Sequence, residues 1–196
     1  YNEEARLEDG IKRTFSYIDE EIKSECNVYI IDNGSTDKTG EIARYLTDTY
    51  AHVFYYRIEE KGVGAAFRKG VSISRDDVIG YMDVDLATDI SHLREVERLF
   101  CKRDIEIVNA SRFSRKSRTS GGRWYRNITS YGLIFLLKIS LNMKATDAIC
   151  GFKFFRRDTV IELINVSSRE NGWFYIIELL LRAERENRRI YELPVR

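Results

Sequence analysis

Several features are scarce in this sequence of 196 residues, and each scarcity narrows the class of protein. There is 1 proline, and we find neither a segment of biased composition nor an internal repeat. The 3 cysteines, Cys26, Cys101 and Cys150, are widely spaced without a CxxC pair, which argues against a disulfide framework or a zinc site and favours a reducing compartment. The longest apolar run, GLIFLL at 132–137, is far shorter than the ~20 residues that a membrane-spanning helix needs.

Net charge is also nearly absent, at +1, so the composition indicates no nucleic-acid partner. Apolar residues make up 43% and charged residues 32%, as in an ordinary globular protein with a buried core. No secretory signal is visible. Tyr1–Glu4 reads as a helix start with Asn2 as its cap, and the chain stops directly after a predicted strand. We therefore expect one domain cut from a longer protein; the sequence indicates no oligomeric state.

Apolar periodicity predicts that helices and strands alternate along the first 110 residues. Because the strands are apolar on both faces, they indicate an α/β fold with a mostly parallel sheet flanked by helices on both faces. The predicted strands lie at 27–31, 52–58, 77–83 and 105–110. After them the pattern changes to a basic loop, a helix to about residue 142, a strand at CGFKFF, a helix over 173–187 and a strand over 189–195.

Carboxylates follow an apolar strand in the stretch YMDVDLATD, residues 81–89. In an extended segment residues i and i+2 point to the same side, so Asp83 and Asp85 would present their carboxylates together. Adjacent like charges repel unless a cation or a shared proton lies between them, and hard oxygen ligands suit Mg²⁺ or Mn²⁺. The alternative is a solvated loop whose acids precede a helix capped by Ser91, and Asp89 fits a cap or turn.

Two further strand ends carry groups that suit a ligand at the carboxyl edge of the sheet. Asp32 ends VYIID and would bind a base or ribose, or else be a turn residue ahead of Gly34. Gly62 and Gly64 would let the backbone approach a ligand, with Lys61 offering charge. Because this loop follows a later strand and lacks the third glycine of GxGxxG, we reject a dinucleotide-binding site.

The basic loop is the other strong local signal, because its cations occur with no acid among them. They are Arg112, Arg115, Lys116, Arg118, Arg123 and Arg126. Arginine forks suit phosphate, and Gly121 and Gly122 would let the loop move as a lid. A solvated flexible loop is the alternative. The adjoining GLIFLL helix is either a core helix or one with a lipidic neighbour.

Taken together, the ordered motifs resemble the family 2 GT-A glycosyltransferases, and within them the polyprenyl-phosphate (dolichyl-phosphate) mannose and glucose synthases. The motifs are YNEE, IIDNGSTDKT, KGVGAAFRKG, MDVDLAT, ASRF, TDAICGFKFF and IIELLLRAERENRRIYELPV. The stretch DxxxGFK, Asp147 to Lys153, separates this branch from the rest of the family. The resemblance implies a single GT-A domain over 1–196, truncated at both ends, with a nucleotide-sugar half at 1–110 and an acceptor half at 111–196.

The resemblance also implies the roles of individual residues. Those expected at the nucleotide sugar are Tyr1, Asn2, Glu4, Asp32, Gly34, Ser35, Lys61, Gly64 and Asp83. Asp83 and Asp85 would hold Mg²⁺ or Mn²⁺, and the acceptor phosphate would meet Arg112, Arg126 and Ser130. The groups expected to act in catalysis are Asp147, Asp85 and Arg112.

The implied activity is inverting transfer of a hexose from a UDP-glucose-like donor or GDP-mannose to a polyprenyl or dolichyl phosphate. It would take place on the cytoplasmic side of a membrane, with the protein peripheral or anchored by segments outside this chain. Since a phosphate monoester has a second pKa of about 6, its oxygen needs little help from a base, and we expect Asp147 to orient the acceptor or an arginine.

Three alternatives stay open. A transferase acting on a sugar or protein hydroxyl would need a true base. A non-catalytic module would bind the nucleotide sugar without turnover. Glu178 is a second candidate for the catalytic carboxylate, unless it only pairs with Arg182 one helical turn on.

Overall fold

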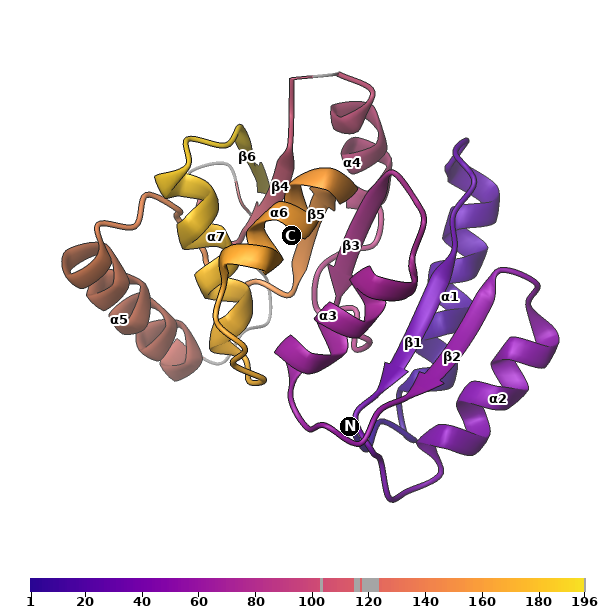
Figure 1. Cartoon of the computed structure of the whole chain (residues 1–196). Helices are drawn as coiled ribbons and strands as arrows, with labels where there is room; N and C mark the ends of the chain where they lie inside the picture. Colours follow the sequence, from indigo (N-terminus) through magenta and orange to yellow (C-terminus); the bar gives the residue numbers. More distant parts are fainter. Residues whose placement is uncertain (103, 115–116, 118–123, 196) are drawn as a thin grey trace.

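The computed structural model describes residues 1–102, 104–114, 117 and 124–195, without the side chains of 124–131. Helices and strands alternate along most of the chain, as the apolar periodicity predicts (Figure 1). In chain order they are α1 (Leu7–Glu21), β1 (Val28–Asp32), α2 (Thr39–Thr49), β2 (Val53–Arg57), α3 (Val63–Ile73), β3 (Val78–Met82), α4 (His92–Phe100), β4 (Ile107–Ser111), α5 (Trp124–Leu141), β5 (Phe152–Arg156), α6 (Arg157–Val166), α7 (Phe174–Arg185) and β6 (Ile190–Pro194).

The N-terminal part is a parallel pair of strands with helices packed against it. β1 and β2 run parallel in register from Val28 opposite Val53 to Asp32 opposite Arg57. Apolar side chains of α1, β1, α2 and β2 form one buried cluster, which includes Leu7, Ile30, Ala43, Leu46 and Val53. The parallel pairing places Asp32 at the carboxyl end of β1, where the sequence predicts a ligand edge.

The remaining strands form a mixed sheet in the order β3-β5-β4-β6. β4 and β6 are parallel, as expected, but β5 is antiparallel to both of its neighbours, β3 and β4. The reason lies in residues 146–151, which cross at the carboxyl ends of β3 and β4, where the amide of Asp83 donates to the carbonyl of Gly151 at 3.1 Å. A strand that enters the sheet from this edge runs against its neighbours. The strands thus form two separate sheets, and one of the two contains an antiparallel strand. The fold belongs to the predicted α/β class, but its strands are less parallel than expected.

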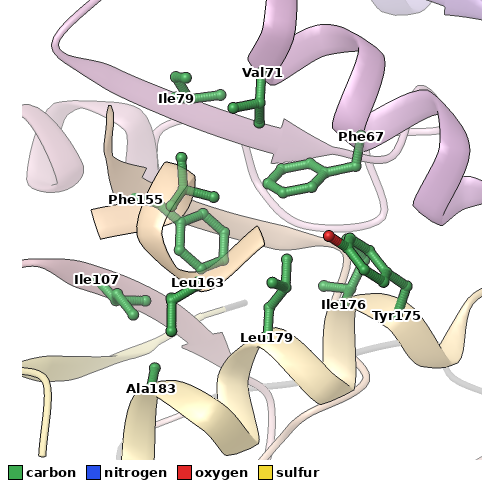
Figure 2. Packing of buried hydrophobic residues seen from close by; sticks show 11 residues of the cluster. Phe67, Val71, Ile79, Ile107, Phe155, Leu163, Tyr175, Ile176, Leu179 and Ala183 are labelled. Carbon is green, nitrogen blue, oxygen red and sulfur yellow. The ribbon is translucent and has the colours of Figure 1, made fainter. Parts of the chain in front are cut away.

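Helices cover both faces of the mixed sheet. On one face, Ile79, Phe155 and Ile107 pack against side chains of α3, α6 and α7, including Phe67 and Leu179 (Figure 2). On the other face, residues of α4 pack against the alternate residues of β3, β4, β5 and β6. On the strands the second cluster extends to Met82, Ala110 and Phe152, so the polar side chains of Asp83 and Arg112 begin at the border of the core.

Helix α5 lies at the side of the domain, away from the mixed sheet (Figure 1). It contacts the rest of the protein through Leu137, which joins a buried cluster with Ile177 and Leu180 of α7. Phe135 and Ile139 are 66% and 69% exposed. Within the described residues, no helix combines the length and apolar character needed to cross a membrane.

Candidate active site

The carboxylate of Asp32 is buried at the end of β1 and both of its oxygens are engaged. Oδ1 accepts the amide of Ser35 at 2.9 Å, and Oδ2 accepts the hydroxyl of Tyr55 at 3.0 Å. Burial by itself raises the pKa of Asp32, but these hydrogen bonds and the charge of Arg57 outweigh it and hold the pKa below its usual range. The contact with Ser35 is that of a turn residue, one of the two roles that the sequence indicates. Contact with a base stays a prediction.

The N-terminal segment lies on the loop that follows β1. The amide of Asn2 donates to the hydroxyl of Ser35 at 2.9 Å, and the side chain of Asn2 accepts the amide of Thr36 at 3.0 Å. Glu4 accepts the amide of Lys38 at 3.0 Å. The prediction that Asn2 caps the first helix is wrong, because α1 begins at Leu7 and Asn2 binds a loop more than thirty residues away.

The expected nucleotide-sugar residues of the two loops thus meet at one end of β1 and β2. The ring of Tyr1 lies 5.4 Å from the ammonium of Lys61, close enough for a cation–π contact. Asn33 joins the same loops, because its amide donates to the carbonyl of Gly62 at 2.7 Å. Gly34 has a φ of 71°, a left-handed conformation that lets the chain turn back under Tyr1 and Asn2.

The glycines after β2 have a packing reason of their own. A Cβ on Gly62 would lie 2.0 Å from the carbonyl oxygen of Asn171, and a Cβ on Gly64 would lie 2.7 Å from the Cβ of Tyr175. The amide of Gly64 also donates to the carbonyl of Asn171 at 2.8 Å. The backbone that these glycines admit is therefore that of residues 170–172, and a role of Gly64 toward a ligand stays a prediction.

Asp83 lies directly against Gly151. A Cβ on Gly151 would lie 1.7 Å from Oδ2 of Asp83, and the hydroxyl of Tyr81 donates to Oδ1 at 2.9 Å. Asp83 is an exposed residue, but its close contact with Gly151 partly desolvates the carboxylate, which raises the pKa of Asp83; the hydrogen bond from Tyr81 opposes this shift, and the charge of Asp85 adds to it. A carboxylate held beside a second one in this way is a group that a cation would stabilise.

The sequence predicts that Asp85 continues the extended strand of Asp83. In the structure Asp85 lies instead in a turn after the strand. β3 ends at Met82, a turn follows, and Leu86 has a φ of 49°. Asp85 accepts the amide of Ala87 at 3.0 Å and lies 3.8 Å from the guanidinium of Arg6. The two carboxylates are near enough for the charge of Asp85 to act on Asp83, but each has its own set of partners.

Arg112 and Asp147 form an ion pair at the carboxyl end of β4, in which the carboxylate is buried and the guanidinium is partly exposed. Asp147 is 0% exposed, and it accepts hydrogen bonds from the amide, Nε and Nη2 of Arg112 at 2.8–3.2 Å. The amides of Ile149 and Cys150 donate to the same carboxylate, each at 3.1 Å. Every lone-pair direction on the inner side is thus in use. Asp147 holds the guanidinium of Arg112; its orienting role in a reaction stays a prediction.

Lys153 lies beside the candidate site, although the sequence predicts no role for it beyond its place at the end of the DxxxGFK motif. It is 0% exposed on β5, and its ammonium donates to the carbonyl of Cys150. Burial lowers the pKa of Lys153, while the nearby carboxylates of Asp147 and Asp83 oppose that shift. The only sequence signal was its position inside the apolar stretch FKFF, where an unpaired lysine is unexpected.

The other predicted groups either have structural partners nearby or lie outside the residues that the structure describes. Glu178 pairs with Arg182 at 2.7 Å and accepts the amide of Ser168 at 3.0 Å, which supports the structural alternative for Glu178. Cys150 is buried and packs in the cluster beneath α4. The predicted groups that lie outside the described residues are Arg115, Lys116, Arg118, Gly121, Gly122 and Arg123, together with the side chains of Arg126 and Ser130.

Comparison with known proteins identifies the family. The model of the family "Glycosyl transferase family 2" matches residues 1–164. The chain is 28% identical over 197 residues to "Glycosyltransferase AglD" of Haloferax volcanii and 30% identical over 206 residues to "Dolichyl-phosphate beta-glucosyltransferase ALG5A" of Trichomonas vaginalis. All of this chain is covered in both cases, but it spans only 31% and 62% of the two relatives.

Solved structures show the same fold. Glucosyl-3-phosphoglycerate synthase from Mycobacterium tuberculosis, in complex with UDP, superposes with a TM-score of 0.69 at 19% identity, over 99% of this chain and 66% of that one. The same enzyme with Mn²⁺, UDP-glucose and phosphoglyceric acid gives a TM-score of 0.67 at 19% identity, over 98% of this chain and 66% of that one. The GT-A architecture predicted from the motifs is confirmed.

Proposed function

Since the chain belongs to glycosyl transferase family 2, we propose that it transfers a hexose from a nucleotide-diphosphate sugar to a polyprenyl or dolichyl phosphate, with inversion. The observation on which this rests most is the placement of Asp83 and Arg112 at the two ends of residues 147–151. Asp83 lies on Gly151, and Arg112 is held by Asp147. A carboxylate suited to a metal–diphosphate and a guanidinium suited to a phosphate are thus both held by the segment 147–151.

The donor end would use Mg²⁺ or Mn²⁺. Among the described residues no group of three or more His, Cys, Asp or Glu could hold a metal alone. Asp83 and Asp85 fit the usual Mg²⁺ arrangement, in which one or two carboxylates are completed by substrate phosphates and water. The metal would supply positive charge for the departing nucleoside diphosphate. The relatives named as dolichyl-phosphate beta-glucosyltransferases and the neighbour crystallised with UDP-glucose favour UDP-glucose over GDP-mannose.

The acceptor end would be built on Arg112. Its guanidinium is fixed by the fork with Asp147, yet its side chain stays 32% exposed, so the outer edge can meet an anion. Arg126 and Ser130 are the further groups proposed for the acceptor phosphate. A phosphate monoester with a second pKa of about 6 is already an anionic nucleophile at neutral pH. Because the carboxylate of Asp147 is engaged by five donors, it suits positioning better than proton transfer.

The proposed acceptor places the reaction at a membrane surface, and α5 offers a fitting element. Phe135, Leu136 and Ile139 are between 61% and 69% exposed, although they are apolar. The charged residue on the same half of the helix is a cation, Lys138. An apolar stripe with a basic neighbour suits the headgroup region of an anionic membrane. We propose that the domain works on the cytoplasmic side of this membrane, peripheral or anchored by segments outside this chain.

Two measurements test the proposal. Calorimetry with UDP-glucose and with GDP-mannose, in Mn²⁺ and then in EDTA, should show metal-dependent binding of one donor that Asp85→Ala abolishes. Asp89→Asn is the matched control, because Asp89 accepts the amide of Ser91 through an oxygen that asparagine keeps. Labelled sugar should then pass to dolichyl phosphate and not to dolichol. Transfer to dolichol would establish a hydroxyl acceptor, and binding without turnover would establish a non-catalytic module.

A further inference from the structure

A row of polar residues crosses the mixed sheet at the border of its core. Tyr81 is opposite Lys153 in the pairing of β3 with β5, Lys153 is opposite Asn109 in the pairing with β4, and Asn109 is opposite Glu192 in the pairing with β6. Residues directly opposite one another share a face of the sheet. The row lies two residues beyond Ile79, Phe155, Ile107 and Ile190, hence on the face that α3, α6 and α7 cover. We call these four residues the polar row.

Three members of the polar row bind the backbone of residues 146–151. Glu192 accepts the amide of Thr146 at 2.5 Å, Asn109 donates to the carbonyl of Asp147 at 3.0 Å, and Lys153 donates to the carbonyl of Cys150. The fourth, Tyr81, donates to Asp83, which lies on Gly151. Residues 146–151 are therefore fastened to the sheet from one end to the other.

Lys153 is one of the two inner members of the row. Close packing alone does not explain why a lysine is buried at this position. Its side chain is 0% exposed and carries three donor hydrogens, of which the contact with Cys150 uses one. Across the strand, Oδ1 of Asn109 is buried without a hydrogen-bond partner among the described residues. Burying an apolar side chain at this position would cost less desolvation free energy than burying an amine. Stability of the fold therefore does not account for the lysine.

We propose that Lys153 is a positioning residue of the transfer reaction, which sets the placement of Arg112 relative to Asp83 by holding the carbonyl of Cys150. This rests on the proposed function, because Arg112 is the acceptor group and Asp83 the donor group only in that reaction. Cys150 lies between the residue that orients Arg112 and the residue that seats Asp83. An amine donates hydrogen bonds in both protonation states, so the contact with Cys150 persists whether or not Lys153 is charged.

The variant Lys153→Met tests this, because methionine keeps the unbranched stem and removes the donor. We expect kcat to fall about a hundredfold, as a misplacement near 1 Å can cause, while the KM of the donor changes less than about threefold. Amide hydrogen exchange of Ile149 and Cys150 should become about tenfold faster, the factor that one lost buried hydrogen bond corresponds to. Exchange in β1 and β2 should stay unchanged.

Thr159→Val is the matched control, since Thr159 is a buried polar residue under the same sheet that bonds Glu106 and not residues 146–151. It should leave kcat and the exchange of 147–151 unaltered. Lys153→Gln, which keeps a donor on a shorter side chain, should fall between wild type and Lys153→Met, and it replaces that variant if methionine prevents folding.

The outcomes separate the two proposals. If wild type transfers no sugar to dolichyl phosphate, the proposed function is wrong, and the exchange of Ile149 and Cys150 still decides whether Lys153 holds the segment. Unchanged exchange at these two amides overturns the role of Lys153. So does exchange that rises throughout the domain together with a lowered thermal midpoint, because Lys153 would then act on the fold as a whole. Equal changes of kcat and of both KM values overturn it as well.

Discussion

Arg112 and Asp147 face one another in a two-pronged ion pair, with Nε of Arg112 2.8 Å from Oδ2 and Nη2 3.2 Å from Oδ1 of Asp147. The carboxylate is fully buried while the guanidinium keeps an exposed edge, so the pair turns a flexible arginine into a fixed donor at the surface of the site. In the proposed reaction, the aspartate of the DxxxGFK motif could therefore act by positioning Arg112, without moving a proton.

The first prediction concerns Asp147→Asn. Asparagine keeps the side-chain volume of Asp147 but sets an NH₂ group against the N–H donors that the carboxylate accepts. Arg112 therefore loses its counter-charge and its orientation. We expect the KM for dolichyl phosphate to rise about tenfold to a hundredfold, the range that corresponds to a lost charge-assisted hydrogen bond. The unfolding free energy should fall by about 2 kcal/mol, less than for a fully buried pair because Arg112 is partly exposed.

The steady-state pH profile distinguishes this role from that of a general base. If Asp147 positions Arg112, the shape of the kcat profile stays as in wild type. A loss of the acidic limb of kcat, combined with an unchanged acceptor KM, would mean that Asp147 removes a proton, and the orienting role would be wrong.

The second prediction concerns Gly151→Ala. The new Cβ would overlap Oδ2 of Asp83, a short side chain that can swing away without a shift of the backbone. The fold should therefore persist, while Mn²⁺-dependent binding of UDP-glucose weakens by about tenfold or more, since binding relies on the placement of that carboxylate. Calorimetry on the folded variant measures this.

A second glycine provides the control. Gly132 is an exposed residue of α5, and no described atom outside its own helix backbone and chain neighbours lies within 4 Å of where a Cβ would stand, so Gly132→Ala should leave donor binding unchanged and stabilise the helix by about 1 kcal/mol. If Gly151→Ala binds the donor as wild type does, the seat of Asp83 on Gly151 has no part in metal binding.

The third prediction concerns Asp83→Asn and its dependence on pH. The folded state raises the pKa of Asp83, so above this pKa the ionised carboxylate lowers the stability of the metal-free protein. Asp83→Asn should therefore be more stable than wild type at neutral pH and bind no donor in the presence of Mn²⁺. The stability difference should shrink as the pH falls through the folded pKa toward the ordinary carboxyl range, because the wild-type group then takes up a proton.

Thermal unfolding of both proteins without metal, across this pH range, measures the difference. A constant gap between the two midpoints would show that Asp83 does not titrate abnormally. A wild-type protein that is more stable than the variant at neutral pH would contradict the prediction outright.

Much of the site could be predicted from the sequence because it depends on strand ends. Asp32 ends an apolar strand, Asp83 and Arg112 each come directly after one, and a run of parallel strands brings such ends to one edge. The order of the motifs then indicated the family. Local spacing was enough for these features, since each is contained in a few consecutive residues.

Features that depend on register could not be predicted. Lys153 is buried because β5 enters the sheet in reverse between β3 and β4, and Gly151 is a glycine because Asp83, far away in the chain, lies against it. No local pattern encodes either pairing. Asn2 shows the same effect at the N-terminus, where a good cap residue binds Thr36 instead, because a distant partner outweighs local propensity.

The last prediction concerns the exposed apolar side of α5. If the domain works at a membrane, Phe135 and Ile139 enter the headgroup region, and the double variant Phe135→Ser/Ile139→Ser should lose most of its binding to vesicles that contain an anionic lipid. Both side chains are mostly exposed, so the thermal midpoint should stay unchanged. Val166→Ser, which removes a 52% exposed apolar side chain from α6, is the matched control and should sediment with vesicles as wild type does. Equal sedimentation of all three proteins would show that the exposed apolar side of α5 does not contact lipid.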